Sequence, residues 1–131
     1  MNRKQRNDIE IVGMDADKTH KYEGEMHHVY LTLSASPTSD WVDDFNDSWR
    51  NHFYMMKRHA QVEGAFIRAD CPIDEVGGGL MGEIKKIMSE VNAREKQRVE
   101  HALAARDEAK RQDKEDREKI EEAAKRINTK N

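Results

Sequence analysis

The chain has 131 residues, of which 36% are hydrophobic and 37% are charged, and its formal net charge at pH 7 is −3. Its single cysteine excludes an intramolecular disulfide, and no apolar run is long enough for a signal peptide or a membrane span. The charged fraction exceeds the roughly 25% of a typical globular domain. We therefore expect a small cytoplasmic domain with a further segment that adds little to the core.

The first part of the chain predicts a leader and two strands. Residues 1–7 are polar and basic, which is typical of a disordered leader. Apolar residues alternate with polar neighbours over Asp8–Asp15, so we expect a short strand there. Ala16–Glu25 is charged and predicts a turn or a hairpin loop. Met26–Ala35 shows the clearest alternation in the chain and predicts a half-buried strand, paired antiparallel with the first.

The next stretch, Ser39–Lys57, predicts an amphipathic helix against which the core is built. Thr38 or Ser39 can cap its N-terminus. Its apolar residues recur every three or four positions, as one face of an α-helix requires. They are Trp41, Val42, Phe45, Trp49, Phe53 and Met56. Aspartates crowd its first half and basic residues its second, which suits the helix dipole. We therefore interpret the aspartates as a solvated face and not as a metal site.

The rest of the globular part predicts one more strand and a second helix. Ala60–Cys71 alternates in the manner of a strand, and because a helix precedes it, we expect it to lie parallel to the previous strand through a right-handed crossover. Pro72–Val76 predicts a single helical turn, and Gly77–Gly79 then break the chain. Leu80–Asn92 carries an apolar stripe at helical spacing. The expected fold class is α+β over residues 8–92: a small three-stranded sheet with two helices on one face, in the order ββαβα.

Residues 93–131 are expected to form a long charged C-terminal helix, which extends from the globular domain as an arm. Residues 92–131 contain no Phe, Trp, Tyr, Gly or Pro, and their helix propensity is high. A thin apolar stripe, which is absent over Lys110–Lys119 and returns at Ile120, and pairs of opposite charge at i,i+4 continue the helical pattern from Leu80 to Ile127. Apolar residues at a and d positions are not sustained over several heptads. Three interpretations therefore stay open: a self-associating coiled coil, an exposed single helix, or a helix that binds another protein.

No set of residues in the sequence matches a recognised catalytic or metal-binding motif. His27 and His28 are neighbours on a strand and point to opposite faces, so they do not easily share a metal ion. His52 could form a catalytic pair with Asp44 or with Cys71, but the sequence places neither pair beside an oxyanion site. A buried structural cysteine is the commoner case. We expect no cofactor and no metal, and we lean against an enzyme.

The function that the sequence favours is that of a non-enzymatic protein-interaction or assembly protein, a homo-oligomer that associates through its globular domain, its C-terminal helix or both. The candidate interface residues are Tyr54, Met55, Arg58, Val99, Leu103, Ile120 and Ile127. One alternative is a nucleic-acid-associated accessory protein that uses Arg3, Lys4 and Arg6 with basic positions of the arm. Another is a small enzyme with its site between sheet and helices.

The polar face of the expected sheet is a second surface to which a nucleic acid could bind. Its residues are His28, Tyr30, Thr32 and Arg68. Only Tyr30 and Phe66 could stack on bases there, and the globular part is acidic, so RNA binding at this face is not favoured.

Overall fold

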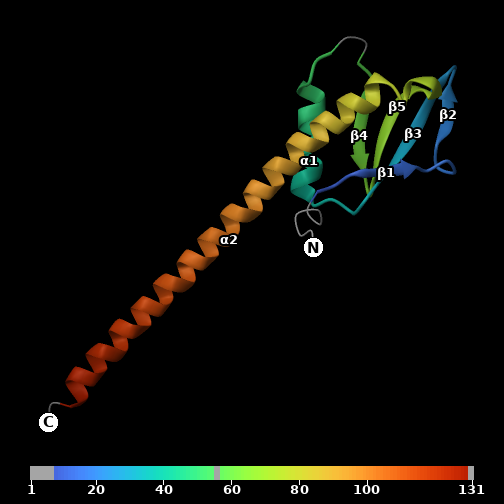
Figure 1. Ribbon diagram of the computed structural model, residues 1–131. Helices are drawn as coiled ribbons and strands as arrows, with labels where there is room; N and C mark the ends of the chain where they lie inside the picture. Colours follow the sequence, from blue (N-terminus) through green and yellow to red (C-terminus); the bar gives the residue numbers. More distant parts are fainter. Residues whose placement is uncertain (1–7, 55–56, 130–131) are drawn as a thin grey trace. The chain divides into compact units, whose positions relative to one another are not determined.

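The structure of the chain is a computed structural model that describes residues 8–54 and 57–129 (Figure 1). It divides into two compact units, Met1–Glu95 and Lys96–Asn131. The first unit is an α+β domain, and the second continues the last helix. The leader expected over residues 1–7 lies outside the described residues.

Five strands form one antiparallel sheet, where we expected three. They are β1 (Ile11–Met14), β2 (His20–Glu23), β3 (Met26–Leu33), β4 (His59–Glu63) and β5 (Phe66–Pro72). The strand order is β1-β3-β5-β4, and β2 also pairs with β3. Every pairing is antiparallel, and two helices complete an α+β fold. The expected class is therefore confirmed, whereas the three-stranded ββαβα order is not.

Two glycine turns account for the extra strands. The stretch Ala60–Cys71 is the hairpin β4–β5 and not one strand, because Gly64 turns the chain with a φ of 60° that glycine adopts at little cost. Gly24 does the same with a φ of 54° between β2 and β3, so Ala16–Glu25 contains a strand. Because the hairpin reverses the chain, β5 pairs with β3, and it does so antiparallel. The expected parallel crossover is wrong for this reason.

The helix α1 (Ser39–Asn51) begins as expected and ends earlier than expected. Thr38 Oγ1 accepts a hydrogen bond from the Trp41 N–H at 3.2 Å, which confirms the cap at that end. At the other end the Lys57 ammonium group donates to the carbonyl oxygens of Trp49 and His52. A cation that binds the last carbonyl groups is favoured at a helix C-terminus. Lys57 therefore closes the helix and does not extend it.

The early end of α1 removes two residues from the expected apolar stripe. Phe53 lies beyond the helix and is 86% exposed. Met56 lies outside the described residues. The stripe that reaches the core is therefore shorter than the sequence pattern.

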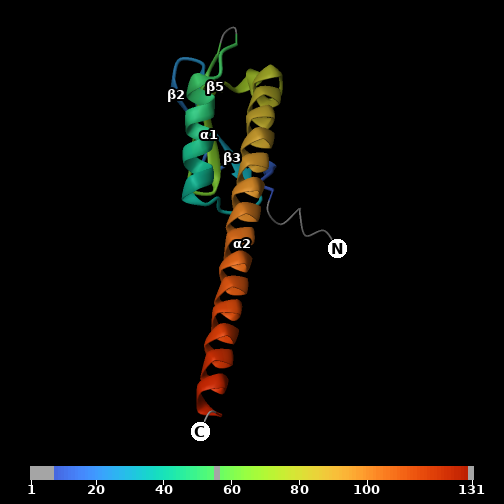
Figure 2. The same ribbon diagram turned by 90° about the vertical axis from the view of Figure 1, so that its left-hand side faces the viewer.

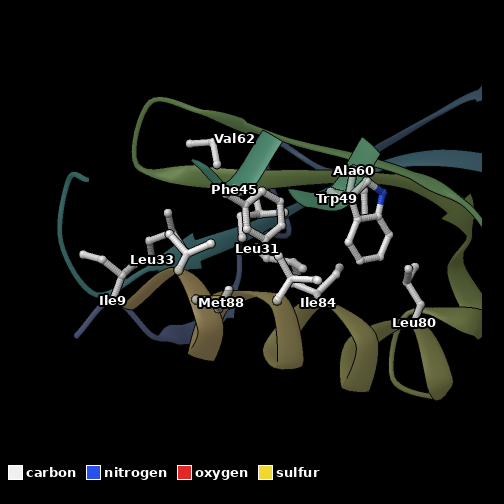
Figure 3. Packing of buried hydrophobic residues seen from close by; sticks show 14 of the residues in the cluster. Ile9, Leu31, Leu33, Phe45, Trp49, Ala60, Val62, Leu80, Ile84 and Met88 are labelled. Carbon is white, nitrogen blue, oxygen red and sulfur yellow. The ribbon is translucent and has the colours of Figure 1, made fainter. Parts of the chain in front are cut away.

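A single hydrophobic core lies between one face of the sheet and the two helices (Figures 2 and 3). From α1 come Trp41, Phe45 and Trp49, whose successive ring centroids are 5.7 and 6.2 Å apart. The helix α2 (Gly79–Asn128) follows the turn η2 (Ile73–Glu75) and buries Leu80, Ile84, Ile87, Met88 and Val91. The strands contribute alternate residues, chiefly Val29, Leu31, Leu33, Val62, Ile67, Ala69 and Cys71. Both helices thus cover the same sheet face, as expected.

The side chain of Asn92 ties the start of the domain to its end. Its Oδ1 accepts hydrogen bonds from the Ile9 N–H at 3.0 Å and from Trp41 Nε1 at 2.8 Å. Its Nδ2 donates to the Ile9 carbonyl oxygen at 3.0 Å. Ile9 and Trp41 are both buried, so one amide satisfies three polar groups that the core would otherwise leave unpaired.

We predict that Asn92→Ala lowers the free energy of unfolding by about 2–4 kcal/mol, because three hydrogen bonds are lost and the Trp41 indole N–H stays buried without a partner. Urea unfolding followed by tryptophan fluorescence measures this change. Gln97→Ala, at an exposed position of the same helix, is the control and should change stability by less than about 0.5 kcal/mol. Equal effects of the two substitutions would contradict a structural role for Asn92.

Candidate interaction surfaces

The second unit presents an apolar stripe that no described residue covers. Every residue from Val99 to Glu122 is exposed. The large apolar side chains on it are Val99, Leu103, Ile120 and Ile127, which are 40%, 48%, 58% and 71% exposed. Isolated exposed apolar residues are normal, but several on one stripe of a helix mark an interaction surface more often. Four of the candidate interface residues therefore lie where an interface could form.

Ion pairs within the helix stabilise this segment, whose side chains are not buried. Arg111 Nη1 lies 2.6 Å from Glu115 Oε2, and Arg117 Nε lies 3.2 Å from Glu121 Oε2. Such i,i+4 pairs each stabilise a helix by about 0.3–0.5 kcal/mol. The helical pattern expected from Leu80 to Ile127 is confirmed by α2.

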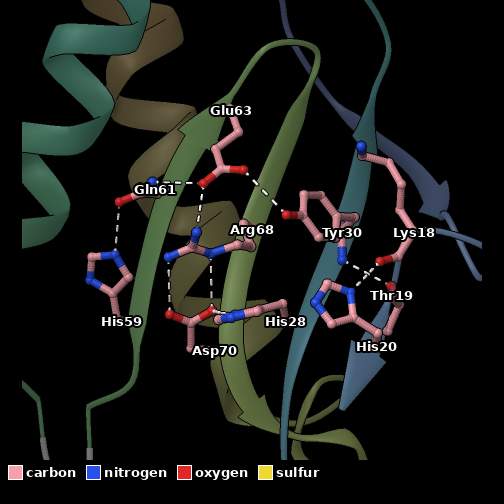
Figure 4. A network of polar contacts seen from close by, with 10 residues as sticks. All are labelled: Lys18, Thr19, His20, His28, Tyr30, His59, Gln61, Glu63, Arg68 and Asp70. Atoms are coloured by element: carbon pink, nitrogen blue, oxygen red, sulfur yellow. Dashed lines mark hydrogen bonds and ion pairs between the residues drawn. The ribbon is translucent and has the colours of Figure 1, made fainter. Parts of the chain in front are cut away.

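The sheet face opposite the core carries a polar network centred on Arg68 (Figure 4). The Arg68 guanidinium donates to Glu63 at 2.7 Å and to Asp70 at 3.1 Å. Asp70 also contacts His28 Nδ1 at 2.7 Å, and the Tyr30 hydroxyl donates to Glu63 at 3.3 Å. Burial, the largest single effect, opposes the charge of Arg68, but the hydrogen bond to Asp70 and the two carboxylates outweigh it and raise the pKa of Arg68. The network is therefore satisfied by its own members.

The aromatic rings on this face are also occupied by neighbours. Tyr22 stacks on His28 with ring centroids 3.9 Å apart. Tyr30 meets Phe66 edge to face at 5.9 Å, and the Lys18 ammonium group lies 4.9 Å from the Tyr30 ring centroid and 5.3 Å from that of Phe66. The two rings that could have stacked on bases thus contact each other and a lysine, which gives the RNA hypothesis no support.

A cavity of about 380 Å³ lies at the start of α2. It is lined by Tyr54, Arg58, Glu75, Gly78, Gly79, Leu80 and Glu83. Arg58 forms two hydrogen bonds with Glu75, at 2.9 and 2.8 Å, which raise the pKa of Arg58 and lower that of Glu75. Glu83 pairs with His52 Nε2 at 2.6 Å. The charged groups around the cavity are therefore already paired.

Tyr54, one of the candidate interface residues, is not exposed. It is partly buried, packs against the core and contacts the Trp49 ring edge to face at 5.8 Å. Its hydroxyl is inaccessible to solvent and forms no well-aligned hydrogen bond with a described residue. Burial raises the pKa of Tyr54, although the neighbouring Arg58 backbone acts against this shift. Met55, the neighbouring candidate interface residue, lies outside the described residues.

The residues considered for catalysis have separate partners. His52 pairs with Glu83, and Asp44 lies 4.0 Å from Arg94. Cys71 is fully buried in β5, and burial raises the pKa of its thiol to about 11. A thiolate nucleophile requires the opposite shift. Among the described residues no group of three or more His, Cys, Asp or Glu side chains could hold a metal ion.

No protein-family model, no curated protein and no solved structure matches the chain. No helix within the described ranges is both long and apolar enough to cross a membrane.

We predict that Cys71 of the folded protein does not react with a chromogenic disulfide reagent at pH 8. The thiol pKa of about 11 leaves almost no thiolate, and the side chain is 0% exposed. In denaturant the same thiol should react completely within minutes. Rapid labelling of the folded protein would contradict a purely structural cysteine.

We predict that Arg68→Met lowers the free energy of unfolding by about 1–3 kcal/mol, because it leaves the half-buried carboxylates of Glu63 and Asp70 without their cation. Arg50→Met is the matched control. Arg50 pairs with Asp47 on the exposed side of α1, and such a pair contributes at most about 1 kcal/mol. Denaturant unfolding compares the two variants, and a larger loss in the control would contradict the network.

Proposed function

We propose that this chain is a non-enzymatic interaction protein that self-associates through the part of α2 from Lys96 to Asn128. The observation that carries the proposal is the stripe of Val99, Leu103, Ile120 and Ile127, exposed on a helix that buries none of them. Full burial of one such side chain is worth about 1.5–3 kcal/mol. A second helix laid along the stripe removes this surface from water.

The globular unit offers weaker surfaces for self-association. The edge strand β4 is partly covered, because the Val62 N–H donates to Asn46 Oδ1 of α1 at 3.0 Å. On the other side of the sheet, β1 and β2 have only 4 residues each. Short or covered edges are the usual protection against edge-to-edge pairing. Together with the partly buried Tyr54, this favours the helix over the globular unit as the site of association.

Neither alternative function gains a specific observation. Arg3, Lys4 and Arg6, which a nucleic-acid-binding role would use, lie outside the described residues. Several basic side chains of the second unit, such as Arg111 and Arg117, pair with acidic residues of the same helix. We therefore propose neither a nucleic-acid-binding protein nor an enzyme.

We predict that the full chain is an oligomer in multi-angle light scattering and that a chain ending after Gln97 is a monomer. The truncation removes the exposed stripe and keeps the residues of the core, all of which precede it. Circular dichroism and tryptophan fluorescence check that the shortened chain folds. Dimers of equal mass from both chains would assign the interface to the globular unit instead, and two monomers would end the proposal.

Point substitutions in the full chain provide the matched comparison. Ile120→Asp places a charge on the stripe and should weaken self-association by at least about tenfold, which corresponds to about 1.4 kcal/mol. Ala104→Asp adds the same charge on the opposite side of the helix and should leave the oligomer unchanged. Equal loss in both variants would indicate a general effect of charge and not a specific face.

A further inference from the structure

Charged residues interrupt the apolar stripe at regular positions. In a heptad frame that starts at Val99, the apolar a and d positions are Val99, Ala102, Ala109, Ile120, Ala123 and Ile127, and Leu103 lies beside them at an e position. Three charged residues occupy the remaining a and d positions of this stretch, namely Arg106, Asp113 and Asp116. All three are exposed, and among the described residues of the second unit neither Arg106 nor Asp113 has an ion-pair partner. We call the line of a and d positions from Val99 to Ile127 the seam. Along it one cation is followed by two anions, and this order affects whether two such helices pair in parallel or antiparallel orientation.

A parallel pair of these helices would place like charges against each other. In a parallel, in-register dimer each a or d residue faces its own copy. Arg106 would then face a second Arg106, and Asp113 and Asp116 would likewise face their own copies. Like charges at a desolvated seam are strongly unfavourable. The charges therefore act against the parallel arrangement.

An antiparallel pair can match Arg106 with an acidic residue. When the helices run in opposite directions, a positions face d positions, and two-fold symmetry makes every contact occur twice. If Val99 lies opposite the partner's Ala123, then Arg106 lies opposite the partner's Asp116. In this register Ala102 faces the partner's Ile120, so large apolar side chains meet small ones, and Asp113 faces the partner's Ala109 and not a second acidic residue.

Other antiparallel registers lose this match. A shift of one heptad in one direction places Asp113 opposite the partner's Asp116, so two like charges meet. A shift in the other direction places the apolar Val99 opposite the partner's Asp116. The charged residues at the e and g positions beside the seam are all basic, so they favour neither orientation over the other, and two of them, Arg117 and Arg126, pair with acidic residues of their own helix.

We propose that the segment Lys96–Asn128 pairs with a second copy of itself in antiparallel orientation, in the register that places Arg106 opposite the partner's Asp116. This rests on the self-association proposed above. The charged residues at the a and d positions specify the orientation and the register of the two helices, and they lower the affinity of the dimer, as buried polar residues do in other helix pairs.

Disulfide trapping in the full chain tests the orientation. The variants are Val99→Cys and Ala123→Cys, and the wild-type chain controls for the buried Cys71. In the antiparallel pair a mixture of the two variants forms cross-linked heterodimers under mild oxidation, and each variant alone forms no more dimer than the wild type. A parallel pair gives the reverse result, with each variant cross-linking to itself, and overturns the proposal.

The outcomes separate the two proposals. If light scattering finds the unmodified chain monomeric, self-association fails, and the orientation fails with it. If the chain is dimeric but Val99→Cys cross-links to itself, or if no variant cross-links above the wild type, the antiparallel seam alone is overturned.

A charge exchange tests the register. Arg106→Asp alone should weaken the dimer by about tenfold or more, because it sets two aspartates against each other. Adding Asp116→Arg restores an opposite-charge pair and should return the affinity to within about threefold of the wild type. Lys125→Asp, which changes the charge equally on the far side of the helix, should have little effect. A double variant no tighter than Arg106→Asp alone overturns the register.

Discussion

The α+β domain depends on the stack of three aromatic rings along α1. Trp41, Phe45 and Trp49 follow one another at four-residue spacing, and each ring is tilted by only 6° from the next. Each such side chain buries roughly 150–250 Å², a large share of the apolar area available to a chain in which only 6% of the residues are aromatic. The sheet and the first turns of α2 supply mainly aliphatic side chains, which fill the space on either side of the stack. Both tryptophans also have partners for their indole N–H groups, so the stack buries no unpaired donor.

The parts of the fold that could be predicted are those in which the spacing of apolar residues within one segment determines which side chains are buried. The stripe of α1 and that of Leu80–Asn92 both repeat every three to four residues, and both reach the core. Ala60–Cys71 was misread as one strand although its alternation changes phase: the buried residues are Ala60 and Val62 before the turn at Gly64, and Ile67, Ala69 and Cys71 after it. The end of α1 could not be predicted either. The apolar spacing runs on to Phe53, and the helix stops because the Lys57 side chain folds back onto its last carbonyl groups.

The candidate surfaces likewise differ in whether the local sequence pattern could predict them. The exposure of Val99, Leu103, Ile120 and Ile127 could be predicted from the sequence, because the charged residues around them leave no second apolar layer. The Arg68 network could not, because it depends on the register of β3 against β5 and on the hairpin that brings Glu63 beside Arg68. The contrast between the two surfaces supports the proposal that the chain self-associates through the second unit. The polar face of the sheet satisfies its own charges and rings, whereas the second unit leaves its apolar stripe in water.

The position of Asn92 bears on the order in which the domain can form during synthesis. Its amide binds Ile9 across 83 positions of sequence and is followed by the residues of the second unit. The sheet and α1 are complete once β5 has been made, yet their apolar face has no cover until the residues up to Val91 exist. A nascent chain that stops between Pro72 and Leu80 therefore carries a paired sheet with one side of its core open to solvent. Exposed apolar surface of this kind is what chaperones bind and what drives aggregation. Translation past Asn92 ends this vulnerable interval, since Asn92 follows the last core residue, Val91, and also binds Ile9 just before β1.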